Sequence, residues 1–389
     1  MDSVVIIDAK RTAIGKFRGE FADVSAVELG TQLVKKLLKM NKVDPKSVDQ
    51  FIFGNVYQAG AGQNPARQIA INSGAAVEST AMTLNQVCGS GMKAVHEATN
   101  ALLLGDADII VAGGIESMSN AAFYAKRVGK LEASDEQGDT LFRDGLWDAF
   151  NNKHMGITAE NVAQKYAVTR QQQDQFAFAS QQKAANSIDK LQNEIIPIEV
   201  NGEEITKDES IRANTTLEKM ETLKPAFEEG GTVTAGNSSP LNDGAAALIM
   251  MTKTKAEELG LDYVAEITGY TEVGVNPNFM GYAPYYAIKK YIDKYDTDLD
   301  NVDLFEINEA FASQAVAVTR DLNLPADKVN IHGGAIAIGH PLGATGAKLI
   351  VSLINALQST DQKTGIASIC IGGGMGMALG IKLSSTTRH

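Results

Sequence analysis

The sequence predicts an α/β protein made of two similar halves, with a segment of different character inserted between them. Three observations support this prediction. Short apolar runs rich in Val and Ile alternate with helical stretches, a pattern typical of sheets covered by helices. Motifs in the two halves repeat at a nearly constant spacing, and the residues between the halves differ in composition.

Strands are expected where apolar residues run almost without interruption, as they do in strands that are covered on both faces. The candidate strands are residues 3–8, 50–53, 108–112, 247–252, 302–307 and 366–371. Helices are expected where apolar side chains recur on one helical face. The candidate helices are residues 26–40, 91–104 and 344–357.

An internal repeat is carried by three pairs of short matches that occur in the same order. The pairs are 49–56 with 303–310, 90–93 with 345–348, and 112–114 with 371–373, at offsets of 254, 255 and 259. The middle pair opens a predicted helix in each half. Near-equal offsets in one order indicate a duplicated α/β unit.

The segment between the halves is rich in Gln, Asn and charged residues and carries no convincing copy of the repeat. Amphipathic helices are expected at about 156–166 and 170–187, followed by an acidic, turn-rich stretch at 200–210. The predicted boundaries are 1–118 and 242–262 for the N-terminal half, 119–241 for the insertion, and 263–389 for the C-terminal half.

The overall composition excludes several classes of protein. Hydrophobic residues make up 44% and charged residues 21% of the 389, which is typical of a globular chain. The net charge of −12 argues against nucleic acid or an anionic membrane as the main partner. Two cysteines are too few for a disulfide framework and favour a reducing cytoplasm. No apolar run approaches the ~18 residues of a membrane span.

Cys88 is a candidate nucleophile, because it follows an extended stretch and directly precedes a predicted helix. The thiolate is the reactive form of cysteine, and a helix N-terminus stabilises it. Gly89 and Gly91 would let a ligand approach the backbone. A buried structural cysteine explains the position equally well.

The same glycines, Gly89 and Gly91, together with Asp108 imitate a dinucleotide-binding fingerprint. A strand and a helix precede them, however, which disfavours NAD binding.

His340 and Cys370 are candidate acid/base residues. His340 lies in the glycine-rich loop 333–346 just before a helix, and histidine suits proton transfer near neutral pH. A lone histidine in a loop is, however, more often only a surface residue. Cys370 ends an apolar strand and runs into a glycine-rich turn, which a core cysteine would also explain. None of these signals is decisive alone.

Together, seven short blocks resemble the thiolase family over essentially the whole chain. In family order they are residues 87–91, 113–118, 154–156, 236–239, 308–311, 339–343 and 370–374. The resemblance implies a five-layered αβαβα fold of two thiolase-type halves, with residues 119–241 as an inserted loop domain. It also implies that the chain is an acyltransferase.

The resemblance further implies a role for each candidate residue. Cys88 would carry the acyl group as a thioester, with His340 as its proton acceptor. Cys370 would be a second acid/base that removes a proton from the methyl carbon of the incoming acetyl-CoA. Asn308 would hold a water that forms one oxyanion hole with His340. The N–H groups of Cys88 and Gly372 would form the other oxyanion hole.

By the same resemblance, coenzyme A would be held mainly by the insertion. The matching positions are Arg212, Lys219, Leu223, Phe227, Ser239, His154, Met155 and Phe311. The insertion has 13 basic and 19 acidic residues, a net charge of −6, so individual side chains would bind the anionic CoA. A solvated helix charge explains Lys219 equally well, and for His154 pocket lining is favoured over catalysis. Pro240 stands where many biosynthetic members carry Gly, and it removes an N–H.

The implied activity is the reversible Claisen condensation of two acetyl-CoA to acetoacetyl-CoA and CoA. The pair 154–155 favours this short-chain branch of the family, whereas the pair 239–240 leaves open a degradative 3-ketoacyl-CoA thiolase of broader chain length. A decarboxylating condensing enzyme is disfavoured by Cys370 and by the block at 308–311.

The family resemblance implies a homotetramer, a dimer of dimers. No tightly bound cofactor is expected, and no metal, because the histidines lack ligand spacing. The physiological direction stays open, since mevalonate, polyhydroxyalkanoate and ketone metabolism all use this step.

Overall fold

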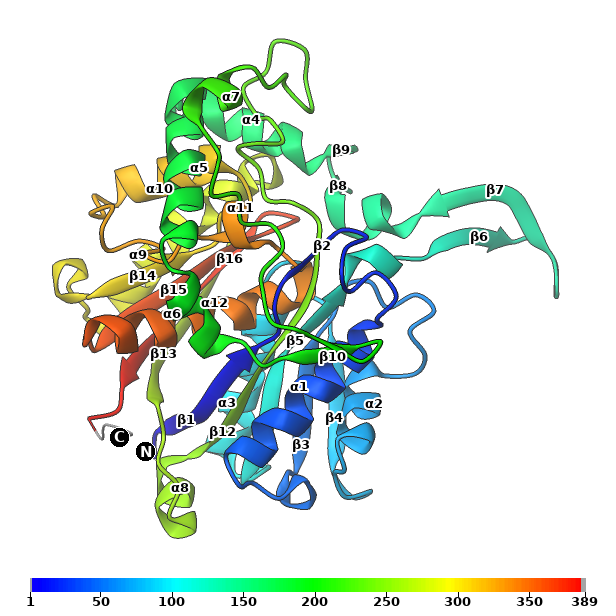
Figure 1. The fold of residues 1–389 in the computed structure, drawn as a ribbon, viewed down its shortest axis with the longest axis vertical. Coiled ribbons are helices and arrows are strands. Elements are labelled where there is room, and N and C mark those ends of the chain that lie inside the picture. Colours follow the sequence, from blue (N-terminus) through cyan, green and yellow to red (C-terminus); the bar gives the residue numbers. More distant parts are fainter. Residues whose placement is uncertain (1, 386–389) are drawn as a thin grey trace.

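The computed structural model describes residues 2–385, in which two similar halves lie side by side and a third segment packs on both of them (Figure 1). The main elements of the N-terminal half are β1 (Val4–Arg11), α1 (Ala26–Met40), β3 (Gln50–Gly54), α2 (Pro65–Asn72), β4 (Thr80–Leu84), α3 (Ser90–Leu104), β5 (Ile109–Ser117) and β12 (Asn242–Thr252). Its shorter elements are β2 (Gly15–Lys16), η1 (Pro45–Ser47) and α8 (Lys253–Leu259).

The C-terminal half repeats this order of elements. They are β13 (Ala265–Gly274), η5 (Pro277–Tyr282), α9 (Ala283–Tyr295), η6 (Leu299–Asn301), β14 (Leu304–Ile307), α10 (Ala312–Asp321), α11 (Ala335–Ile338), α12 (Leu342–Thr360), β15 (Thr364–Ile371) and β16 (Met375–Leu383). Where the first half has β4, the second has a single parallel bridge from Phe305 to Val329. The predicted duplication is therefore confirmed.

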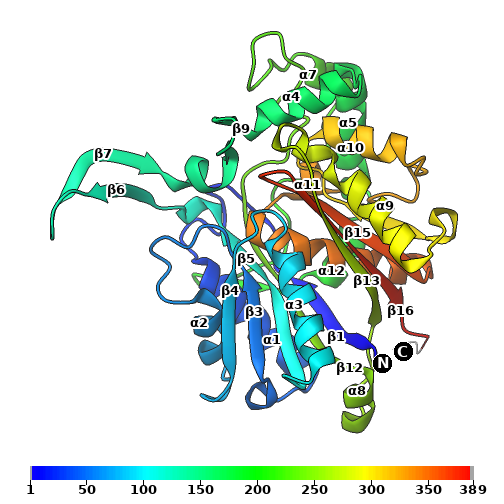
Figure 2. The same ribbon diagram turned by 180° about the vertical axis from the view of Figure 1, so that it is seen from behind.

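Ten strands of residues 2–385 form one continuous sheet that spans both halves, and nine of them follow the order β14-β15-β16-β13-β1-β12-β5-β3-β4. The halves meet where Val5 and Ile6 of β1 pair with Glu266 and Ala265 of β13. α3 and α12 pack against each other and against strands of both parts. α1 and α2 cover the outer face of the N-terminal part, and α9 covers that of the C-terminal part (Figure 2). This gives the predicted five layers.

The predicted strands and helices are present, but several strands extend beyond their apolar runs. β1 continues to Arg11, and β12 begins at Asn242. The extension is possible because the polar residues at these ends are buried with partners: Arg11 pairs with Asp208 at 2.7 Å and also bonds Glu194. Among the described residues, no helix is long and apolar enough to cross a bilayer.

Two glycines near Cys88 serve the packing of the halves. A Cβ at Gly91 would lie 2.7 Å from the backbone nitrogen of Ala347 in α12, and a Cβ at Gly89 would lie 2.5 Å from the side chain of Ile371. A side chain at either position would push the halves apart. The expectation that Gly89 and Gly91 admit a ligand is therefore wrong, because they admit the other half of the chain.

Most of the segment between β5 and β12 lies over one end of the two halves, whereas its residues 188–205 run back along α12 and α1 (Figure 1). Its elements are η2 (Met118–Asn120), β6 (Phe123–Arg127), β7 (Ala133–Asp139), η3 (Leu141–Leu146), β8 (Trp147–Asp148), β9 (Lys153–His154), α4 (Met155–Lys165), α5 (Arg170–Ala185), α6 (Ile188–Leu191), η4 (Gln192–Glu194), β10 (Ile198–Val200), β11 (Glu203–Ile205) and α7 (Leu217–Glu221). Helices at both expected positions are confirmed as α4 and α5, but the amphipathic character expected of α5 is absent, because its buried residues include Gln173, Asp174 and Gln181. The β6–β7 hairpin projects away from the rest of the molecule.

Candidate active site

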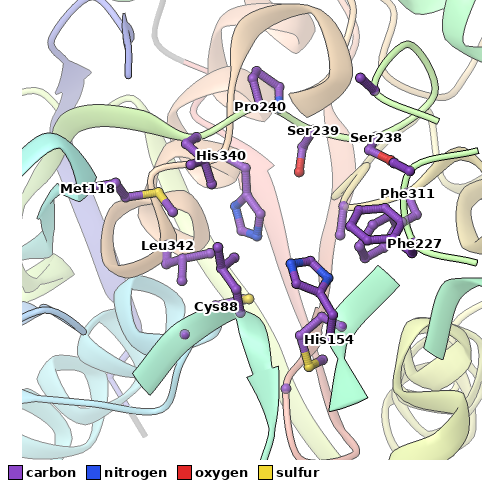
Figure 3. A pocket seen from close by; sticks show the side chains of 18 of the residues that line it. Cys88, Met118, His154, Phe227, Ser238, Ser239, Pro240, Phe311, His340 and Leu342 are labelled. Carbon is purple, nitrogen blue, oxygen red and sulfur yellow. The ribbon is translucent and has the colours of Figure 1, made fainter. Parts of the chain in front are cut away.

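A cavity of about 380 Å³ opens where the two halves meet the inserted segment. Figure 3 shows Cys88, His340 and His154 around it. Its lining from the N-terminal half and the insertion includes Cys88, Met118, Phe142, Leu146, His154, Met155, Arg212, Phe227, Ser239 and Pro240. The C-terminal half contributes Met280, Ala310, Phe311, His340, Leu342 and Gly372. The cavity is a crevice lined mostly by apolar side chains with a few polar groups, as is typical of small-molecule sites.

Cys88 is held on a strained turn between β4 and α3. The residue before it, Val87, has a φ of 46°, which a β-branched side chain rarely adopts. The hydroxyl of Ser90 accepts the N–H of Gln86 at 2.8 Å and donates to the carbonyl of Val87 at 2.6 Å. The turn therefore fixes the sulfur at the cavity wall, and such strain concentrates at functional sites.

The electrostatics of Cys88 favour a neutral thiol. Burial raises its pKa to about 12, although the backbone N–H groups of Gly372 and of Cys88 itself oppose the shift. The helix N-terminus expected to stabilise a thiolate is present, but the effect of burial is larger. A base must therefore take the thiol proton when Cys88 attacks a substrate.

His340 is a neutral base with a defined tautomer. Its Nδ1 lies 2.6 Å from the hydroxyl of Thr345, and that hydroxyl donates its only proton to the carbonyl of Pro341 at 2.9 Å. This hydrogen-bond network assigns the ring proton to Nδ1 and the lone pair to Nε2. Burial, followed by the charge of Lys348, lowers the pKa of His340 to about 3.

Asn308 lies beside His340, directly after β14. Its Nδ2 donates to Nε2 of His340 at 3.4 Å, and its backbone N–H donates to Ser368 at 3.0 Å. Within residues 2–385, the buried Oδ1 of Asn308 has no hydrogen-bond partner. Since buried polar atoms are nearly always paired, this oxygen is available for a further donor.

Cys370 is the next-to-last residue of β15 and is fully buried behind the cavity wall. It packs among apolar residues that include Met155, Met280 and Phe311. Its thiol donates to Oε1 of Gln314 at 3.7 Å. Burial raises the pKa of Cys370, and the nearby Cys88 raises it further. The structure thus brings the two predicted cysteines together at one junction.

All eight residues predicted for coenzyme A line this cavity or a second one beside it. His154, Met155, Arg212, Phe227, Ser239 and Phe311 line the first. Lys219 and Leu223, with Arg212 again, line the second, which has a volume of about 210 Å³. Both cavities share Ser238 and Pro240, so together they form a channel from Cys88 toward the surface of the insertion.

His154 is held as part of the channel wall. Its Nδ1 accepts the N–H of Gly156 at 3.0 Å and so caps α4. Its ring stacks on Phe227 at a centroid distance of 4.5 Å, and Phe227 meets Phe311 edge-on at 6.1 Å. Burial lowers the pKa of His154. The imidazole is therefore a neutral, fixed part of the wall.

Sequence reasoning did not single out several residues of the site. The apolar end of the cavity is formed by Met118, Phe142, Leu146 and Leu342, which no local pattern distinguishes from core residues. Thr345 was seen only as a helix opener. Glu116 lies within a family-like block, and that was its only signal. Its buried carboxylate accepts N–H groups from Asn55, Val56, Tyr57 and Gly343.

Among the described residues, no group of three or more His, Cys, Asp or Glu side chains is placed to hold a metal ion. The duplicated fold, and the meeting of Cys88, His340, Asn308 and Cys370 at one junction, agree with the resemblance to the thiolase family. Family models for the thiolase N-terminal domain and the thiolase C-terminal domain match residues 4–254 and 261–383. The chain belongs to the thiolase family.

Its most similar relatives include acetyl-CoA acetyltransferases. The chain is 49% identical over 388 residues to that of Pseudomonas aeruginosa, covering 97% of this chain and 99% of the relative. It is 48% identical over 391 residues to that of Cupriavidus necator, covering 98% and 100%. The crystal structure of the Bacillus anthracis acetyl-CoA acetyltransferase superposes with a TM-score of 0.95 at 41% identity, covering 99% of both chains.

Proposed function

We propose that this protein is an acetyl-CoA C-acetyltransferase that reversibly condenses two acetyl-CoA to acetoacetyl-CoA and free CoA. The observation that carries the proposal is the pairing of a neutral Cys88 thiol with a buried His340 whose Nε2 bears a lone pair, in one cavity. Relatives of about half identical sequence carry the acetyl-CoA acetyltransferase name.

In the first half-reaction, Nε2 of His340 takes the proton of Cys88 as the sulfur attacks the thioester carbonyl of acetyl-CoA. The tetrahedral oxyanion lies near the N–H groups of Cys88 and Gly372, which already face the sulfur. The C–S bond to CoA breaks, the departing CoA sulfur takes the proton of the Cys370 thiol, and Cys88 is left acetylated with His340 protonated and Cys370 as the thiolate. Covalent transfer divides one difficult condensation into two easier steps.

In the second half-reaction, Cys370 as thiolate takes a proton from the methyl group of a second acetyl-CoA. The resulting enolate attacks the acetyl group of Cys88, and the sulfur of Cys88 leaves with the proton held by His340, so that His340 and both cysteines return to their starting states. Charge on the enolate oxygen needs preorganised donors. Nε2 of His340, once protonated, and a water held by the unpartnered Oδ1 of Asn308 supply them.

The inserted segment, residues 119–241, would act as the domain that holds CoA. The acyl end lies in the apolar cavity, and the pantetheine arm passes Ser239 of that cavity and then the wall at Ser238 that both cavities share. Arg212 and Lys219 on the second cavity bind the phosphates. Pro240 lies in the shared wall without an N–H, so the neighbouring polar groups must orient the arm.

We further propose a cytoplasmic homotetramer. β4 is an edge strand with Met82 44% exposed, and exposed edges pair readily with a second copy. The projecting β6–β7 hairpin exposes Phe123 by 68% and Leu131 by 95%. An isolated hairpin is marginal in water, so contact with another dimer would stabilise it. The molar mass measured by light scattering tests this assembly.

The activity is tested by thiolysis of 3-ketoacyl-CoA substrates of increasing chain length, followed by the loss of enolate absorbance. The expected result is efficient, CoA-dependent cleavage of acetoacetyl-CoA that falls steeply with longer chains. Equal or faster cleavage of long chains would instead support the degradative 3-ketoacyl-CoA thiolase. Absence of cleavage for every chain length would refute both assignments.

A further inference from the structure

We propose that Gln314 is a positioning residue for Cys370 that serves both protonation states of the sulfur. Its amide oxygen accepts the S–H of the thiol, and its amide nitrogen donates to the thiolate. The inference rests on the proposed function, in which Cys370 alternately takes and returns a proton at the methyl carbon of acetyl-CoA.

The position of Gln314 is fixed by α10. This helix begins at Ala312, so Gln314 lies in its first turn and is fully buried. Oε1 of Gln314 accepts the thiol of Cys370 at 3.7 Å and the backbone N–H of Ala310 at 3.2 Å. Because a backbone N–H can only donate, the Ala310 contact establishes which end of the amide is the oxygen.

The other end of the amide is unusual. In the described part of the chain, Nε2 of Gln314 is buried without a hydrogen-bond partner. A buried unpaired amide donor is costly and rare. A core glutamine that served only structure would be expected to pair both ends. The unpaired donor next to a reactive thiol therefore points to a partner that exists during only part of the catalytic cycle.

The chemistry of Cys370 supplies that partner. As a base, the thiolate takes a proton from carbon: the S–H bond forms, the C–H bond breaks, and the electron pair passes into the enolate. While the sulfur is a thiol, Oε1 is the right partner. While it is a thiolate, the lone pairs of Oε1 repel it. Rotation of the amide exchanges its ends and places Nε2–H on the sulfur, at the expense of the Ala310 bond.

Few other groups can stabilise the thiolate of Cys370. The side chains that pack around it from α4, from η5 and from the loop before α10 are apolar, among them Ala159, Met280 and Ala310. The titratable group that faces it is Cys88, from the turn before α3. Besides Gln314, the backbone N–H of Cys370 itself favours the ionised form. Loss of the amide donor of Gln314 should therefore slow the condensation step, which needs the thiolate of Cys370.

The experiment compares Gln314→Met, Gln314→Glu and a matched control, Ser313→Ala, in the full-length protein. Methionine keeps the length of the side chain and removes both ends of the amide. Glutamate keeps an acceptor for Ala310 and for the thiol but has no donor when ionised. Ser313 is equally buried on the same helix and donates one hydrogen bond to Ala159 at 3.0 Å, so its loss reports the purely structural effect.

Two rates are measured for each protein: acetylation of Cys88 by acetyl-CoA, from quenched samples by mass spectrometry, and formation of acetoacetyl-CoA. For Gln314→Met we expect acetylation to stay within about threefold of wild type, while condensation falls about 10- to 100-fold, as for a lost hydrogen bond to a charged group. Gln314→Glu should lose more at neutral pH and recover as the pH rises, because its carboxylate raises the pKa of the Cys370 thiol.

Full condensation activity in Gln314→Met, or an equal loss of both rates, would overturn the inference, as would the same loss in Ser313→Ala. If Gln314→Met does not fold, the pH profile of Gln314→Glu decides, because a profile unchanged from wild type contradicts the inference. The proposed function is judged separately on the wild-type protein, since a wild type without condensation refutes the function itself.

Discussion

The two halves have the same order of elements but carry different side chains at corresponding places. The turn before α3 holds Cys88, whereas the loop before α12 holds His340. The end of β5 holds Glu116, whereas the end of β15 holds Cys370. Duplication therefore supplied the geometry of the site, and divergence of single residues supplied its chemistry.

The two strand ends also differ in how completely their polar groups are paired. The carboxylate of Glu116 accepts four N–H groups, one of them from Gly343 at the start of α12, and so ties the halves together. Near the end of β15, the thiol of Cys370 makes one long hydrogen bond to Gln314, and among the described residues Oδ1 of the neighbouring Asn308 has no hydrogen-bond partner. This difference indicates that Glu116 at the end of β5 has a structural role. The polar groups near the end of β15 keep hydrogen-bonding capacity for a substrate.

The largest expected effect comes from Cys88→Ala, which removes the chemistry of the N-terminal turn. The thiol is the proposed acyl carrier, and alanine cannot form a thioester, so acetylation and condensation should both be abolished. Mass spectrometry of the protein after incubation with acetyl-CoA should show no acetyl adduct. An adduct that persisted at full occupancy would place the nucleophile elsewhere.

Cys370→Ser should separate two reaction steps, the acetylation of Cys88 and the condensation that follows it. Acetylation of Cys88 needs His340 and the oxyanion donors but no carbon acid chemistry, so it should be retained with a modest loss of rate. Condensation should fall by ~10²–10⁴-fold, as for a lost general base, because a serine hydroxyl is too weak an acid to provide the base. Thiolysis should fall with it. Equal loss of acetylation and condensation would contradict separate roles, and near-normal condensation would make Cys370 a core residue.

A smaller effect is expected for Thr345→Val, which keeps the shape of the side chain and removes the acceptor for Nδ1–H of His340. The ring then loses the contact that fixes its tautomer. Acetylation of Cys88 should slow by about 10–100-fold, by analogy with the loss of groups that orient metal-bound histidines. Thr345→Ser should restore the rate, because it keeps the hydroxyl. Equal acetylation rates for the Val and Ser variants would show that Thr345 does not orient the ring.

The fold could be predicted largely from the sequence, because apolar runs, helical periodicity and the repeat are local signals that packing reinforces. The strand ends could not be predicted, since Arg11 extends β1 only through partners almost 200 residues away in the chain. The close packing of Gly89 and Gly91 against the other half could not be predicted for the same reason. Their neighbours, Ile371 and Ala347, belong to the other half of the chain.

The candidate residues that the structure brings together could be named from short motifs, but not their protonation states. A helix N-terminus next to Cys88 predicts a lowered pKa, whereas burial raises it. The lone pair on Nε2 of His340 depends on where the hydroxyl of Thr345 donates, and the unpaired end of Gln314 depends on the neighbours of α10. Both cysteines reach one junction from elements that do not correspond in the two halves, which the repeat alone did not reveal.

The smallest expected effect concerns Glu116, near the end of β5. It is an effect on the stability of the protein rather than on its activity. Burial raises its pKa from 4.5 to about 7, against four N–H donors. Between these values the folded protein retains a proton that the unfolded chain has lost, so the free energy of unfolding should decrease as the pH rises through this window. The slope is at most about 1.4 kcal/mol per pH unit for one group.

Glu116→Gln cannot titrate and should give a flatter dependence of the free energy of unfolding on pH, measured by denaturant unfolding at several pH values between the two pKa values. The variant should also be less stable overall, because a neutral amide satisfies fewer of the N–H donors. The slope should not vanish, since burial also raises the pKa of Asp243 to about 6. The sign of the slope difference is therefore the decisive quantity. An identical slope in both proteins would mean that the N–H donors keep Glu116 ionised throughout, and the strand end would then hold a permanent buried charge between the two halves.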